Sequence, residues 1–252
     1  MTKPREPHWS DIVRSTDFYR DILVTILGVL IALGIGEWAQ SLDWKSKAAE
    51  ASDAIDAELA NNAATFEERI LLQPCLASRI DDLEAVLADA RRTGRIDPVG
   101  TYGATPYRGL ATAAWEDALN SGALAHLPPL QREGLASVYP TIASYNQFVM
   151  EEQQLWWRMR LLADSAGPAD SALLTELGST LKQLAYRARI NGMFAGQLQR
   201  FVTLRGLEPN LKPIFGEDAT RETLAQAVKQ RTICKPLVRG AEAVAAAAKE
   251  GG

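Results

Sequence analysis

Few residues of this sequence have the types and the spacing that a chemical reaction needs. The chain has two histidines, His8 and His126, and nothing in the sequence pairs either of them with a nucleophile or with further metal ligands. Acidic residues do occur in adjacent pairs, but neighbouring residues on a helix point about 100° apart and do not share a site. These pairs are Glu67–Glu68, Asp81–Asp82 and Glu151–Glu152. We therefore expect no enzyme activity, no catalytic residues, no cofactor and no metal site.

Arginines and tryptophans gather at one place, where Arg158 and Arg160 follow Trp156 and Trp157. Their guanidinium groups could bind an anion or stack on the indole rings. The simpler interpretation is that they are surface arginines whose apolar stems cover a helical bundle. A nucleic-acid partner is not indicated, because phosphate contacts require a basic face and the formal net charge is −4. The sequence also lacks the nucleotide-binding and hydrolase motifs that would suggest a reaction.

Cys75 and Cys234 are the two cysteines of the chain, so a single intramolecular pairing exists. Each lies close to a proline, which predicts a position near a helix break. In an exported domain the pair would form a disulfide, and the alternative is two free buried cysteines that behave as small apolar side chains. We expect the disulfide, which would tie the end of the chain to its first long helix.

The first predicted structural element is an apolar run from Ile22 to Gly36, which contains no charged residue. Continued to Leu42, with Glu37 as its one ionisable residue, it makes a helix about 31 Å long, enough to cross the hydrocarbon core of a membrane. A buried core helix and a cleaved signal peptide are the alternatives. The acidic residues before the run argue against a signal peptide, so an uncleaved signal anchor is favoured.

Basic residues predict the orientation of this membrane helix. More of them precede it than follow it closely, which favours a cytoplasmic N-terminus. Those before it are Lys3, Arg5, Arg14 and Arg20, and those after it are Lys45 and Lys47. The predicted organisation is a cytoplasmic segment (1–20), a transmembrane helix (21–43), a helical bundle (44–234) in the periplasm and a weakly ordered, alanine-rich tail (235–252). The predicted location is therefore the inner membrane of a bacterium, with a single pass.

Three small residues, Gly28, Ala32 and Gly36, are spaced by four and form one stripe on the membrane helix. Such a stripe lets two membrane helices approach closely, which suggests a homo-oligomer or another envelope protein as partner. The alternative is that glycine and alanine are simply common in membrane helices.

Helical periodicity dominates the rest of the sequence, which predicts an all-α fold: the membrane helix continues into a long stalk helix and is followed by an antiparallel helical bundle. The stalk helix should kink or break at Pro74 and end at Thr93–Gly94. Thr105–Pro106 predicts the start of the next helix. The further helices are expected at about 129–165, with a kink at Pro140, at about 169–205 and at about 218–232.

Several segments resemble an uncharacterised bacterial family of small single-pass inner-membrane proteins. They are LGVLIALGIGEW, LLQPCLASRIDDLEAVL, AAWEDALNSGALAHLP and the proline-flanked Cys234-Lys235-Pro236. The resemblance spans most of the chain and implies a membrane helix with an all-helical exterior domain. It implies no reaction.

These features together predict a non-enzymatic, membrane-anchored scaffolding or interaction subunit of the cell envelope. The alternative is a periplasmic ligand-binding or sensor module that works through a partner protein, since about 20 cytoplasmic residues cannot form an output domain. An exposed apolar patch of several hundred Å² would favour the scaffold. A pocket with convergent polar groups would favour the ligand-binding module.

Overall fold

The computed structural model describes residues 16–243, with side chains from residue 19 onward. Helices dominate it, so the all-α fold is confirmed, and the only strands in this part of the chain are two short ones. The elements are α2 (Thr16–Thr93), β1 (Arg95–Ile96), α3 (Ala113–Asn120), the 3-10 turn η1 (Ala123–His126), α4 (Pro129–Asp164), β2 (Gly167–Pro168), α5 (Ser171–Leu204), α6 (Lys212–Phe215), α7 (Arg221–Lys229) and the 3-10 turn η2 (Thr232–Cys234). His8 and residues 244–252 lie outside the described residues.

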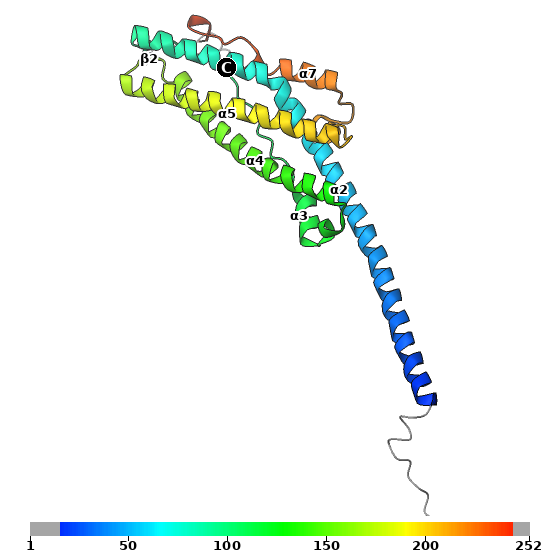
Figure 1. Cartoon of the computed structure of the whole chain (residues 1–252). Coiled ribbons are helices and arrows are strands. Elements are labelled where there is room, and N and C mark those ends of the chain that lie inside the picture. Colours follow the sequence, from blue (N-terminus) through cyan, green and yellow to red (C-terminus); the bar gives the residue numbers. More distant parts are fainter. Residues whose placement is uncertain (1–15, 244–252) are drawn as a thin grey trace, which may run out of the picture.

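The helix α2 is continuous over its 78 residues and runs through Pro74 without a break. Its first part projects from the other helices, and its second part lies among them (Figure 1). The projecting part is long and apolar enough to cross a membrane, and the most apolar window has no buried residue. The second part, predicted to be a stalk, instead contributes one side of the core. The helix ends at Thr93 because Gly94 turns the chain with a φ of +68°, a conformation that suits glycine.

Three long helices, α2 from Ala48 onward, α4 and α5, form the frame of the helical body, which we define as residues 48–243. At one end the strand pairing Arg95 with Pro168 joins the end of α2 to the link between α4 and α5. At the other end Arg205, just after α5, contacts Asp56 of α2, with Nε 2.9 Å from Oδ1. The helix α5 therefore runs antiparallel to both α2 and α4, as Figure 1 shows.

The core of the helical body consists of two apolar clusters. One surrounds Phe66 and Tyr145, whose rings meet edge to face with centroids 6.0 Å apart. The other surrounds Trp156 and extends along α2 through Leu76 and Leu83. The two adjacent tryptophans of α4 differ in burial: Trp156 lies in the core, whereas Trp157 is 65% exposed.

A buried polar network joins the three long helices. Glu152 of α4, fully buried, receives hydrogen bonds from Arg69 Nη1 (3.0 Å), Trp156 Nε1 (3.2 Å) and Asn191 Nδ2 (2.5 Å). Arg69 also donates from Nη2 to the backbone carbonyl of Ala188 at 2.8 Å. A buried charge pair needs this number of partners, since each ion gives up its hydration.

Residues 97–112 form no helix and are here called the extended segment, so the predicted helix start at Thr105–Pro106 is wrong. Two asparagines from other helices hold this segment by pairing with its backbone as a strand would. Asn146 Oδ1 accepts from the amide of Leu110 at 2.7 Å, and Asn62 Oδ1 accepts from the amide of Ala111 at 2.9 Å. The helix begins instead at Ala113, where the carboxylate of Glu58 accepts from the amide of Ala114 at 2.8 Å. Tertiary contacts override the local capping signal here.

The C-terminal region also departs from the expectation. The helix predicted at 218–232 is the shorter α7, which starts after a capping box at Thr220 and Thr223. The beginning of the tail, predicted to be weakly ordered, lies against the segment after β1. Gly100 donates to the carbonyl of Val238 at 3.0 Å, and Ala243 is 4% exposed.

Candidate ligand cavity

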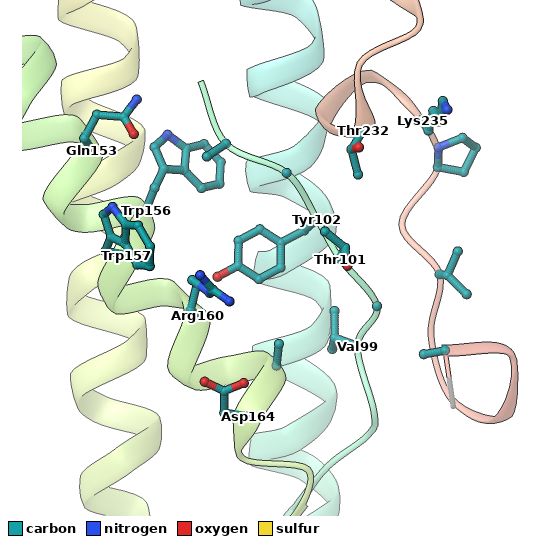
Figure 2. A pocket seen from close by; sticks show the side chains of 17 residues that line it. Val99, Thr101, Tyr102, Gln153, Trp156, Trp157, Arg160, Asp164, Thr232 and Lys235 are labelled. Atoms are coloured by element: carbon teal, nitrogen blue, oxygen red, sulfur yellow. The ribbon is translucent and has the colours of Figure 1, made fainter. Parts of the chain in front are cut away.

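A cavity of about 730 Å³ lies between α4, the extended segment and the end of the described chain. This volume is within the range of pockets that bind small molecules. Figure 2 shows it from close by, with side chains from the three walls turned toward the same space. The helix α4 contributes Gln153, Trp156, Trp157, Arg160, Ala163 and Asp164, the extended segment contributes residues 99–104, and the C-terminal wall contributes Thr232, Lys235, Pro236, Val238 and Ala243.

The C-terminal wall belongs to a strap, residues 231–243, that lies along α2. Cys234 is bonded to Cys75, with the Cα atoms 4.6 Å apart. One turn further along α2, the buried guanidinium of Arg79 donates from Nη2 to the backbone carbonyls of Thr232, at 3.2 Å, and Lys235. Burial lowers the pKa of Arg79, and the nearby Asp82 carboxylate opposes that shift. The predicted pairing of the cysteines thus has the geometry of a disulfide, although Cys75 lies in mid-helix and not near a helix break.

Further contacts hold the strap at both of its ends. Arg231 contacts Glu68, a carboxylate of α2 that is almost fully buried. Arg239 donates to the backbone carbonyl of Asp82 at 2.6 Å and pairs through its backbone with Val99. These contacts on α2 fall at residues 68, 75, 79 and 82, whose spacings of seven, four and three place them along one face of the helix.

The extended segment brings Tyr102 to the cavity. Next to it, Gly103 has a φ of +73°, and a Cβ there would lie 2.7 Å from the backbone nitrogen of Ile233. Only glycine therefore lets the segment approach the strap this closely. Tyr102 is 5% exposed, and its ring lies 6.2 Å from that of Trp156.

The hydroxyl of Tyr102 is buried and has no hydrogen-bond partner among the described residues. It points toward the side chain of Arg160 in Figure 2. Burial raises the pKa of this hydroxyl well above its usual value, while the Arg160 guanidinium lowers it and the Asp164 carboxylate raises it. The phenol is therefore a neutral donor at the cavity wall. A buried hydrogen-bond donor without a partner destabilises the protein. An acceptor group on a bound molecule would remove that cost.

Arg160 is one of the two basic residues that line the cavity, with Lys235 on the C-terminal wall. Its guanidinium lies 4.9 Å from the centroid of the Trp157 ring, in the stacked arrangement that the sequence suggested as one interpretation. Within residues 16–243 it forms no ion pair with a carboxylate. Arg158 lies apart from it and lines a shallow groove with Glu151 and Tyr186. The structure thus separates the two arginines that the sequence left together.

The other predicted site residues lie far from the cavity. Gly28, Ala32 and Gly36 are exposed on the projecting part of α2, and the two glycines have no neighbouring side chain within 4 Å of the place where a Cβ would be. His126 stacks on Trp44, with ring centroids 4.3 Å apart and planes at 13°. No group of three or more potential metal-ligating side chains occurs in the part of the chain that the structure describes. Sequence reasoning missed Tyr102, for which the only signal was a tyrosine within the glycine-rich GTYGAT.

No protein-family model, no curated protein and no solved structure matches this chain. The resemblance to an uncharacterised family of bacterial membrane proteins therefore stays a prediction.

Proposed function

We propose that this protein is a membrane-anchored binding protein of the bacterial inner membrane, whose helical body lies in the periplasm and takes up a small organic molecule that carries an acceptor or anionic group. The observation that carries the proposal is the buried, unpartnered hydroxyl of Tyr102 at the wall of a 730 Å³ cavity, opposite Arg160. The pocket with convergent polar groups is the feature that favours ligand binding over scaffolding.

The lining of the cavity suggests how such a molecule is held. The hydroxyl of Tyr102 and the guanidinium of Arg160 would meet its acidic or carbonyl group, because both are donors. Trp156, Val99 and Val238 offer an apolar surface to the remainder of the molecule. Lys235 and Asp164 also line the cavity and would favour a ligand that places a negative group near Lys235 and a positive group near Asp164.

The experiment measures binding of 2-naphthoate, a planar aromatic carboxylate, to the full chain in lipid nanodiscs by calorimetry, with empty nanodiscs as reference. We expect saturable binding that weakens about 3- to 10-fold in Tyr102→Phe and 10-fold or more in Arg160→Gln, as the loss of a neutral and of a charge-assisted hydrogen bond predicts. The matched controls are Tyr107→Phe, in the same segment but 56% exposed, and Arg158→Gln. Absence of saturable heat, or equal affinity in all four variants, would contradict the proposal.

Stability provides a second readout for Tyr102. If the hydroxyl serves a ligand and not the fold, its removal relieves an unsatisfied buried donor, so Tyr102→Phe should leave the ligand-free protein as stable or up to about 2 kcal/mol more stable. A hydroxyl that supports the fold would instead give a loss of stability.

Scaffolding through self-association is the second candidate, and one observation favours it. The stripe of Gly28, Ala32 and Gly36 is unpartnered in the single chain and lies on the part of α2 proposed to cross the membrane. A dimer of anchors is compatible with a ligand cavity in each helical body. Signalling would then require a partner protein.

A further inference from the structure

The segment from Leu119 to Arg132, here called the corner, connects α3 to α4 through η1 and contacts the projecting part of α2. His126 of η1 stacks on Trp44, and Lys47 lies 5.1 Å from the centroid of the same indole ring. Burial in the helical body begins directly after this contact, since Ala48 is 5% exposed. In Figure 1, α3 lies at the end of the helical body from which α2 projects.

The position of Trp44 fixes the level of the corner relative to a membrane. If α2 spans the bilayer, the apolar run ends at Leu42, and Trp44 lies about 3 Å further along the helix axis. The headgroup region on each side of the hydrocarbon core is roughly 5 to 7 Å thick. Trp44 therefore lies within that region, and His126, stacked on it, lies there too.

The composition of the corner suits this environment. It contains no acidic residue, although the chain as a whole has 31. Two of its leucines project from the protein: Leu119 is 58% exposed and Leu130 is 85% exposed. Leu130 is in the first turn of α4, and side chains of a helix tilt toward its N-terminus, which for α4 is the end at the level of Trp44. Single exposed leucines are common on protein surfaces. These two, however, lie beside the headgroup region, where their side chains can reach the acyl chains of the membrane.

We infer that the corner is a second membrane contact, in which Leu119 and Leu130 enter the boundary between headgroups and acyl chains of a phospholipid bilayer. This inference depends on the proposed membrane anchor but not on the ligand cavity. A contact of this kind fixes the tilt of the helical body, because the anchor alone would leave it free to lean. The stacking of His126 on Trp44 connects the corner directly to α2.

The test places a bimane fluorophore on Leu130→Cys or Leu119→Cys of the full chain in nanodiscs whose phosphatidylcholine carries bromine on its acyl chains. Bromine quenches bimane only at contact, and the bonded Cys75 and Cys234 leave the new cysteine as the one to be labelled. The control is Leu204→Cys, at 88% exposure as open as Leu130. Leu204 is the last residue of α5, and the next residue, Arg205, contacts Asp56 of α2. Asp56 lies about 18 Å beyond Trp44 along the axis of α2, so a label at position 204 should lie outside the headgroup region.

We expect at least twofold quenching at positions 130 and 119 and none at 204. A label at Val29→Cys, in the middle of the apolar run, must be quenched in either case. Quenching at 29 with none at 130 and 119 would overturn the inference while leaving the anchor intact. No quenching at 29 would overturn the anchor, and the inference with it. Two labelled positions in the corner keep the test decisive if one substitution disturbs the fold.

Discussion

The buried carboxylate of Glu152 gives the most direct test of how the helical body is held together. Replacing it by glutamine keeps the size of the side chain and removes its charge. The side chain of Glu152 is 1% exposed, and that of its ion-pair partner Arg69 is 6% exposed, with Nη2 2.9 Å from Oε2. In Glu152→Gln the guanidinium stays buried without a counter-charge, and the new amide presents donors toward Asn191, which already donates to this position.

The expected loss of stability follows from that burial. Breaking a buried pair by neutralising one partner costs about 3–5 kcal/mol, because the other charge remains dehydrated. The adjacent Glu151 is the matched control: its side chain is 32% exposed and pairs with Arg187, which is 28% exposed. There the same substitution should cost less than about 1 kcal/mol, since solvent screens the pair.

Urea unfolding of the full chain in nanodiscs, followed by tryptophan fluorescence, measures both variants. With an m value of about 2 kcal/mol per molar urea, Glu152→Gln should lower the midpoint by roughly 1.5–2.5 M and Glu151→Gln by less than about 0.5 M. The double variant Arg69→Met/Glu152→Leu removes both charges and should be more stable than Glu152→Gln alone. Equal effects at positions 151 and 152 would refute the reasoning, because they would mean that burial does not decide the cost.

Three further predictions concern the anchor and the strap. The Cys75→Ser variant should unfold with a free energy lower by up to about 5 kcal/mol, the chain-entropy value for a separation of 159 residues, and denaturation curves that coincide with and without reductant would contradict this. Alkaline phosphatase fused after Gly94 should be active and β-galactosidase inactive, whereas an active β-galactosidase would reverse the topology. Gly28→Ile and Gly36→Ile should weaken self-association of the span in a membrane reporter assay, and Gly34→Ile, on another face, should not.

The long helices could be predicted from the sequence because each is encoded locally. Hydrophobic periodicity and the glycine just past the end locate the end of α2 at Thr93, and α4 and α5 fall within two residues of the predicted bounds. The pairing of Cys75 with Cys234 could also be predicted, because two cysteines allow only one intramolecular connectivity. Chain order and composition are sufficient for features of this kind.

The ligand cavity could not be predicted, because the contacts that build it join residues distant in sequence. Nothing near Thr105 in the sequence shows that Asn62 and Asn146 will take the place of helical hydrogen bonds there. The burial of adjacent acidic residues could not be predicted from the sequence either. Glu151 and Glu152 do point in different directions, as expected, but only the fold shows that one of them is a buried partner of Arg69.

The strap connects the disulfide to the cavity. One wall of the cavity consists of residues that follow Arg231, and they reach that position through contacts on a single face of α2, of which the bond between Cys75 and Cys234 is the covalent one. Gly103 contributes from the other side, since any side chain there would meet the backbone of Ile233. Tyr102, next to that glycine, is thus positioned by the strap as well as by its own segment. Because the disulfide persists only in an oxidising compartment, the proposed location outside the cytoplasm is also a condition for a well-formed cavity.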